Sequence, residues 1–418
     1  MKKTKKLLCL LTTAILSVSS LAGTVTTVSG YYDAAAYYND DRTYDEEPKI
    51  KVGEFTYKFK RNIKYGDLEI PYSATVVEVP NIKTVEIPKT VTYDNIEFMV
   101  TDLDLYGDYT LGSKYSTENR FTNVEEMILP ETIYNITEFA CFPSLKKINI
   151  PKNTLIDRVN YNYLYYQNES AYYPLGQIFR DCPNLKLSLD PDNPYYIYKN
   201  DLLFSKDGKA LLMSFTSGSV TIPAGVEKVH DYGGYGFSNI TEIQFPNTVT
   251  ELIDSQIFIN SKLTRITLSD NLFSIPDKCF SNSDIKSLKV GKRTKFICWK
   301  AFAFCSSLKK IKISAKKIEI GEYSFAKCTS LKTVTINEAE TIDKGAFYKC
   351  KRLSKVFINN KKKAPEINKN AFKGTKKGIK FCVKNKRVAK SLKKQLKGSG
   401  VRNARIIVKD KVVYKNVK

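Results

Sequence analysis

The stretch ICWKAFAFCSSLKKIKI, from Ile297 to Ile313, indicates the fold because the chain contains two more copies of it. The second copy, IGEYSFAKCTSLKTVTI, runs from Ile320 to Ile336, and the third, IDKGAFYKCKRLSKVFI, runs from Ile342 to Ile358. All three share the pattern Ile-x-x-x-Ala/Ser-Phe-x-x-Cys-x-x-Leu-x-x-Ile/Val-x-Ile. Their Phe residues are 23 and then 22 positions apart. A fixed period of this length predicts a solenoid, in which each turn buries its apolar residues by stacking on its neighbours.

Weaker copies extend the array in both directions. Strands of alternating apolar and polar residues recur and end at a proline, which cannot donate to a strand ladder. These prolines are Pro88, Pro130, Pro151, Pro223 and Pro246. We expect the repeat array to run over residues 68–372, with insertions at 157–176 and 193–215. Residues 193–215 contain two strand patterns joined by an Asp-Gly turn, which predicts a β-hairpin.

The segments outside the array differ in charge and in expected role. Residues 1–22 combine early lysines with an apolar run, which is typical of a secretory signal peptide, with an alternative cleavage site after residue 30. Residues 31–47 hold six acids and one Arg, and we expect an acidic, Tyr-rich flexible N-terminus there. Residues 48–67 are expected to form an N-terminal β cap.

The C-terminal segment, residues 373–418, is strongly basic, with 17 Lys or Arg residues and one acid. Apolar residues at Val388, Leu392 and Leu396 predict one stripe of a basic helix, and 405–408 reads as a closing strand. We therefore expect a basic C-terminal cap on the last turn. The formal net charge of the whole chain is +24, which favours acidic partners without selecting among them.

The repeat Ile-x-x-x-Ala-Phe-x-x-Cys-x-x-Leu-x-x-Ile-x-Ile-Pro resembles the BspA-type, or Treponema pallidum-type, leucine-rich repeat of bacterial surface proteins. The resemblance covers about residues 68–372. It implies an α/β repeat solenoid, a right-handed leucine-rich-repeat superhelix with a parallel β-sheet on the concave face and short helical or irregular convex segments. It also implies a secreted or cell-surface protein used for adhesion, with host matrix proteins or other cells as partners.

The outward positions of the later strands are the first candidate binding surface, because side chains of a strand alternate between its two faces. Eight of 15 such positions between Thr264 and Phe357 are basic and none is acidic. The basic residues are Arg265, Lys286, Lys289, Lys309, Lys310, Lys312, Lys332 and Lys355. Earlier turns expose Glu125, Glu126 and Glu242 instead, so we expect a graded concave surface that suits an acidic partner. The alternative is that these lysines only solvate the sheet and discourage edge pairing.

Tyrosines in the two insertions are the second candidate, because Tyr offers a rigid apolar body with a polar tip. The candidates are Tyr163, Tyr165, Tyr166, Tyr195 and Tyr196. The alternative is that these rings pack the inserted loops locally on the edge of the solenoid.

Cysteines occupy one position of several repeats, namely Cys182, Cys305, Cys328 and Cys350. Eight cysteines remain after removal of the signal peptide, an even number that leaves disulfides open. We favour packing as small buried residues, because the side chains should point inward beside Phe and Leu. With a single His and no Cys-x-x-Cys spacing, no metal site or cofactor is expected.

The chain lacks the sequence motifs of a nucleophile elbow, a zinc protease or a phosphate-binding loop, so we expect a protein that is not an enzyme. The prediction is a secreted or cell-surface protein that binds an extracellular protein, an acidic glycan or a wall polymer. No specific nucleic acid and no transmembrane segment after signal removal are expected. One alternative is a cell-envelope structural protein held on anionic wall polymers by the basic tail. A less favoured one is an extracellular hydrolase.

Overall fold

The computed structural model describes residues 48–65, 68–105, 121–139, 142–156, 179, 182–230, 237, 239–253 and 255–417. These residues form two compact units, which we treat separately. The N-terminal unit comprises the described residues up to Lys206, and the C-terminal unit begins at Asp207. Tyr163, Tyr165 and Tyr166 lie outside the described residues.

The N-terminal unit begins with antiparallel strands and continues with parallel ones. Strands β1 (Ile50–Val52), β2 (Phe55–Tyr65) and β3 (Leu68–Glu78) pair antiparallel in that order. The same sheet continues in parallel through β6 (Ile96–Leu105), β8 (Asn135–Phe139) and β10 (Leu155–Ile156), while β5 (Thr90–Tyr93) pairs antiparallel with β6. A second, parallel sheet consists of β4 (Thr84–Glu86), β7 (Glu126–Ile128), β9 (Lys147–Ile150) and β11 (Lys186–Leu189). Strands β12 (Tyr196–Lys199) and β13 (Leu202–Ser205) form a hairpin, but their turn is Asn200–Asp201, and the Asp207–Gly208 turn expected to join the hairpin follows β13 instead.

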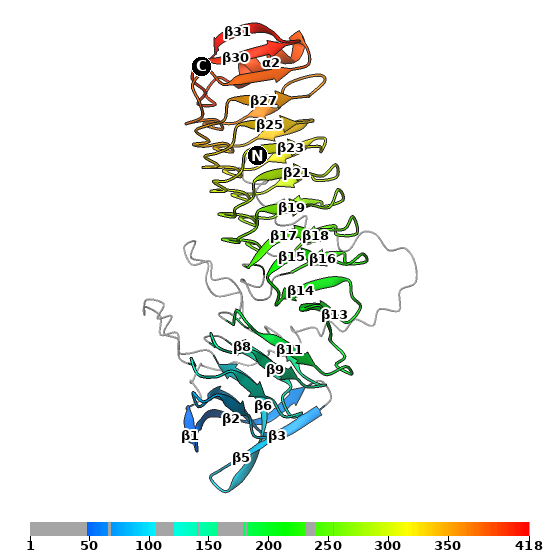
Figure 1. Cartoon of the computed structure of the whole chain (residues 1–418), viewed down its shortest axis with the longest axis vertical. Helices are drawn as coiled ribbons and strands as arrows, with labels where there is room; N and C mark the ends of the chain where they lie inside the picture. The colour runs from blue at the N-terminus through cyan, green and yellow to red at the C-terminus, as the bar shows by residue number, and fades with distance from the viewer. Residues whose placement is uncertain are drawn as a thin grey trace. The chain divides into compact units, whose positions relative to one another are not determined.

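The C-terminal unit is a regular β-solenoid in which each turn contributes strands to two parallel sheets. The longer strands are β15 (Gly218–Thr221), β17 (Ile240–Gln244), β19 (Arg265–Thr267), β21 (Ser287–Val290), β23 (Lys310–Ile313), β25 (Thr333–Ile336) and β27 (Lys355–Ile358). The shorter strands are β14 (Ala210–Ser214), β16 (Lys228–Val229), β18 (Glu251–Leu252), β20 (Ser274–Ile275), β22 (Phe296–Ile297), β24 (Ile318–Ile320), β26 (Ala339–Ile342) and β28 (Glu366–Ile367). Figure 1 shows β19 to β27 stacked as successive rungs. The solenoid prediction is therefore confirmed.

Of the short helical or irregular convex segments that were expected, the described turns contain irregular ones, and no helix lies between the described strands from β14 to β28. Each turn places the short strand before a tight turn that contains two left-handed residues, such as Lys300 and Phe304 with φ of 53° and 65°. Such residues interrupt an α-helix, which needs consecutive right-handed residues. Gly345 takes this conformation in its turn, and a Cβ there would lie 2.5 Å from the Tyr323 ring. The convex segments of these turns are therefore irregular and not helical.

A column of phenylalanines forms the centre of the C-terminal unit. Phe258, Phe280, Phe302, Phe325, Phe347 and Phe372 are fully buried, and neighbouring rings stack with centroids 4.9–5.4 Å apart. Phe381 closes the column with an edge-on contact to Phe372. The Phe spacing seen in the sequence therefore marks one side-chain position repeated at every turn.

The basic C-terminal segment continues the sheet beyond the last repeat. Strands β29 (Lys380–Val383) and β30 (Ala404–Val408) continue the sheet of β21 to β27 in parallel, and β31 (Lys411–Val417) closes it antiparallel. Helix α2 (Lys386–Gln395) buries Val388 and Leu392 and is capped by Asn385, whose side chain accepts a hydrogen bond from the Val388 amide. No helix among the described residues is long and apolar enough to cross a bilayer.

Candidate binding surface

The outward side chains of β15, β17 and β19, and of the sheet formed by β21, β23, β25, β27, β29, β30 and β31, make up what we call the ladder face. From β21 to β30 the paired strands are in register, so equivalent residues of successive turns form straight columns. One column contains Ser287, Lys310, Thr333, Lys355, Lys380 and Arg405, and the next contains Lys289, Lys312, Thr335, Phe357, Cys382 and Ile407. Between these columns lie the buried inward residues, such as Ile311 and Val334. The alternation predicted from the sequence thus places the candidate lysines on one surface.

A third column consists of one lysine from each of three successive turns: Lys286, Lys309 and Lys332. The amide of Lys309 donates to the carbonyl of Lys286, and the amide of Lys332 donates to the carbonyl of Lys309, both at 2.9 Å. All three side chains are exposed. Because neighbouring strands lie about 4.8 Å apart, like charges are stacked directly beside one another, which is unfavourable in a sheet.

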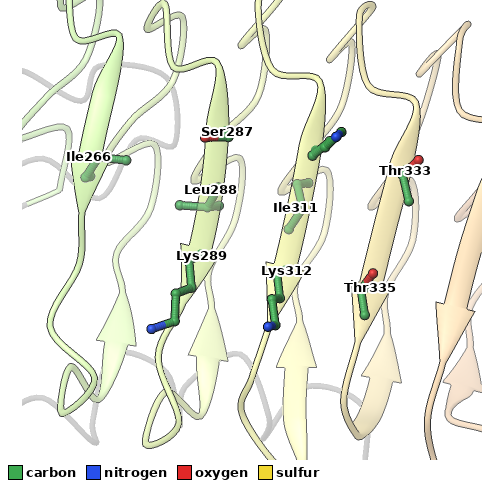
Figure 2. Close-up of a pocket in the computed structure, with 9 residues that line it drawn as sticks. Ile266, Ser287, Leu288, Lys289, Ile311, Lys312, Thr333 and Thr335 are labelled. Carbon is green, nitrogen blue, oxygen red and sulfur yellow. The ribbon is translucent and has the colours of Figure 1, made fainter.

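A hollow of about 310 Å³ lies on the ladder face across β21, β23 and β25. Its polar lining combines the ammonium groups of Lys289, Lys310 and Lys312 with three hydroxyl groups, those of Ser287, Thr333 and Thr335. Figure 2 shows Lys289 and Lys312 extending in the same direction from adjacent strands, with Thr333 and Thr335 on the next strand. The floor is made by Leu288, Ile311 and Ile266. The hollow therefore offers charged and neutral hydrogen-bond donors on one side of an open surface.

The lysines of this region have little compensation from acids. Lys286, Lys309, Lys310, Lys312 and Lys332 form no ion pair with any residue that the structure describes. Lys289 is the exception, with its ammonium group 3.7 Å from a carboxylate oxygen of Asp270. Two ammonium groups about 5 Å apart repel by about 1 kcal/mol in water and by more at a protein surface. An anion placed in the hollow would relieve this repulsion.

The other predicted basic residues have partners on the same face. Arg265 lies at the early end of the basic region, and its guanidinium group is 2.7 Å from Glu242. Lys355 places its ammonium group 4.6 Å from the centre of the Phe357 ring. These two residues therefore flank the hollow without lining it, and the lysines that line it are Lys289, Lys310 and Lys312.

The acidic residues of earlier turns are also paired with cations. In the N-terminal unit, Glu125 lies 3.0 Å from Lys146 and 3.9 Å from Lys83, and these cations lower the pKa of its exposed carboxyl group. Glu126 is in register with Lys147 on the adjacent strand. The early outward positions are therefore mixed in charge, because lysines neighbour their acids.

The tyrosines of the second insertion have different environments. Tyr195 is 39% exposed, whereas Tyr196 is 6% exposed. The Tyr196 hydroxyl donates to the carbonyl of Ile156 at 2.8 Å and accepts from its amide at 3.0 Å. Tyr196 therefore packs the insertion onto the N-terminal unit, which matches the local-packing alternative, and of the pair only Tyr195 presents a ring to solvent.

Sequence reasoning missed the hydroxyl groups of the hollow and the later members of the basic column. Ser287, Thr333 and Thr335 are outward positions that carry no charge, so a search for cations passed over them. Lys380 and Arg405 lie beyond the last copy of the repeat pattern, although their strands continue the sheet in register. Alignment of the strand segments by their buried residues would have found both sets.

The buried cysteines are thiols that stabilise the stacking of turns. Cys305, Cys328 and Cys350 donate to the backbone carbonyls of Phe280, Phe302 and Phe325, at 3.1, 3.2 and 3.0 Å. Burial raises the pKa of the Cys328 thiol, so it remains protonated and able to donate. Among the described residues, no cluster of three or more His, Cys, Asp or Glu side chains could hold a metal ion.

Comparison with known proteins identifies the repeat. A family model described as the BspA type leucine rich repeat region matches residues 210–306 and 252–380, with six copies. A search of curated proteins finds no match to this chain.

Several solved structures are similar to the chain. The pneumococcal vaccine antigen PcpA is 16% identical, with 87% of this chain and 99% of that chain covered and a TM-score of 0.42. A leucine-rich repeat protein from Eubacterium ventriosum is 20% identical, with 72% and 90% covered and a TM-score of 0.45. The leucine-rich repeat protein of T. pallidum is 22% identical, with 44% and 88% covered and a TM-score of 0.35.

Proposed function

We propose that this chain, whose residues 210–380 match the BspA-type leucine-rich repeat, is a non-enzymatic binding protein of the bacterial cell surface. Its ladder face would take an acidic protein or an acidic glycan. The observation that carries this proposal is the hollow, where Lys289, Lys310 and Lys312 meet three hydroxyl groups. The signal-like residues 1–22 support export, and repeat proteins of this kind bind proteins across extended surfaces.

The hollow suits a ligand with carboxylate, sulfate or phosphate groups. Each ammonium group can supply charge, and each hydroxyl can donate a hydrogen bond to an anionic oxygen. A face that served only to solvate the sheet would be expected to interleave acids with its lysines, as the early strands do with Glu125 and Lys146. The unpaired lysines of β23, Lys310 and Lys312, favour a binding role over simple solvation.

The alternative function, attachment to anionic wall polymer by the basic tail, has its own support. The described tail carries exposed cations on α2, such as Lys386, Lys390 and Lys394. These lie on the cap and not in the hollow, so the two functions depend on different side chains. Under the alternative, neutralising hollow lysines would leave polymer binding unchanged.

The test measures the affinity of the full chain for poly-L-glutamate, for dextran sulfate and for teichoic acid at low salt and at 0.5 M salt. The variant carries Lys289→Ser, Lys310→Ser and Lys312→Ser. A matched control carries Lys361→Ser, Lys362→Ser and Lys363→Ser, which removes the same charge from an exposed turn. We expect at least a tenfold weaker affinity for poly-L-glutamate or dextran sulfate in the hollow variant at low salt, and a change below threefold in the control.

Two results would reject the proposal. Equal losses in the two variants would mean that only net charge matters. Binding of teichoic acid alone, unaffected by the hollow variant, would favour the tail-anchoring alternative. Circular dichroism of each variant checks that the substitutions, which all lie on the surface, leave the fold intact.

A further inference from the structure

The ladder face changes character beyond the hollow. In the column that contains Lys289 and Lys312, the following residues are Thr335, Phe357, Cys382 and Ile407, and β31 adds Val412 opposite Ile407. We call Phe357, Cys382, Ile407 and Val412 the apolar strip. Val412 is 41% exposed and the other three are partly exposed. Burial raises the pKa of the Cys382 thiol, so this side chain is uncharged.

A basic column runs beside the apolar strip. Lys355, Lys380 and Arg405 are in register on the same three strands as Phe357, Cys382 and Ile407. None of these cations forms an ion pair with a described residue. The strip and the basic column together therefore suit a ligand that carries both apolar and acidic groups. A purely charged ligand would satisfy the cations and leave the apolar side chains in water.

The chain itself contains a segment of matching chemistry. Residues 31–47 hold six acids, one Arg and five tyrosines within 17 residues. The tyrosines are Tyr31, Tyr32, Tyr37, Tyr38 and Tyr44, with acids between and after them. Tyrosine is well suited to a partly apolar interface, because it buries its ring and keeps its hydroxyl in water.

We propose that residues 31–47 of a second copy of the chain dock on the apolar strip, with tyrosines on the strip and acids against Lys355, Lys380 and Arg405. The strip crosses four strands, a distance of about 15–20 Å. A 17-residue chain reaches at most about 60 Å when extended, so its length suffices to follow the strip. This docking site shares the ladder face with the hollow but rests on different residues, and it does not depend on the proposed function.

The test uses the full chain without residues 31–47 and a fluorescent peptide of residues 31–47. Fluorescence anisotropy measures peptide binding to this deletion protein and to the complete protein. We expect saturable binding to the deletion protein and at least fivefold weaker apparent binding to the complete protein, where residues 31–47 of other copies compete. The competition should strengthen with protein concentration, as docking between copies requires.

Variants of the two partners locate the contact. In the deletion protein, Phe357→Ser combined with Ile407→Ser should weaken peptide binding at least tenfold, and a peptide with all five tyrosines changed to Ser should lose as much. The hollow variant with Lys289, Lys310 and Lys312 changed to Ser should bind the peptide within threefold of the parent. Circular dichroism confirms the fold of the double variant, whose changed side chains face outward.

Three results would overturn the docking proposal. The first is that the peptide does not bind the deletion protein. This result would overturn the proposal even if vesicles of anionic phospholipid bound the strip. The second is equal binding by the Tyr-to-Ser peptide. The third is loss of peptide binding in the hollow variant but not in the strip variant, which would move the contact to the hollow and leave the proposed function intact.

Discussion

Cys328 illustrates how one side chain serves the stacking of turns. It is fully buried, and its thiol donates to the carbonyl of Phe302 in the preceding turn at 3.2 Å. Cys305 and Cys350 repeat this contact in their own turns. In an earlier turn the equivalent residue is Ser283, whose hydroxyl donates to the carbonyl of Phe280 at 2.8 Å, within its own turn. The position therefore selects a small side chain that can donate a hydrogen bond.

Replacing Cys328 tests this interpretation. Cys328→Ser should change the free energy of unfolding by less than about 1 kcal/mol, because the hydroxyl can donate to the same carbonyl. Cys328→Ala should cost about 1–3 kcal/mol, because the carbonyl loses this donor and a small cavity remains. Urea unfolding followed by circular dichroism measures both. A Ser variant that is less stable than the Ala variant would show that the apolar character of sulfur matters more than donation.

The phenylalanine column gives a second residue-level prediction. Phe325 is fully buried, with its ring stacked 5.3 Å from Phe302 and 5.4 Å from Phe347. Phe325→Ala should destabilise the protein by about 3–5 kcal/mol, because it removes a large core side chain and leaves a cavity. Phe304 in the neighbouring turn is 41% exposed, so Phe304→Ala is the matched control and should cost less than about 1 kcal/mol. Similar losses in the two variants of a urea unfolding experiment would contradict the stacked core.

At the scale of single elements, α2 depends on its N-cap. Asn385 accepts the amide of Val388 at 2.9 Å, and the first turn of the helix contains no acid. Asn385→Ala should cost about 0.5–2 kcal/mol, because this helix-end amide loses its partner. Asn385→Asp should be as stable as the parent or more so, since a carboxylate also favours the positive end of the helix dipole. Thermal unfolding measures both, and an Asp variant as unstable as the Ala variant would contradict the capping role.

The long strands were predictable because their buried and outward residues alternate over several repeats. The spacing of the repeated Phe residues indicated the period of the repeat, and the apolar stripe of Val388, Leu392 and Leu396 indicated the terminal helix. The short strands were not predictable, since two residues such as Phe296 and Ile297 cannot show a periodicity. The left-handed turns also gave no signal, because residues such as Lys300 and Tyr323 hold positions where Gly or Asn would be expected.

The candidate site was predictable in part. The sequence identified the outward lysines, because alternation alone assigns a face. The hollow depends on how three turns align, and only the register places Lys310 between Ser287 and Thr333. The burial of Tyr196 depends on a contact with Ile156, 40 residues away, which no local pattern reveals.

At the scale of the whole molecule, the net charge of +24 supplies a general attraction that any polyanion would feel. This attraction is screened beyond about 8 Å at physiological ionic strength. The hollow adds a local arrangement of ammonium and hydroxyl groups that net charge does not describe. A polyanion bound by the hollow should therefore contact the residues that line it, whereas general attraction would spread contacts over all exposed cations.

The most direct test is a lysine footprint of the complete protein. Each lysine is acetylated briefly with and without saturating poly-L-glutamate, and mass spectrometry measures its rate of modification. We expect Lys289, Lys310 and Lys312 to be protected at least fivefold, while Lys361, Lys362 and Lys363 change less than twofold. Protection that is uniform over all exposed lysines, or confined to the C-terminal cap, would contradict the assignment of the ladder face as the binding surface.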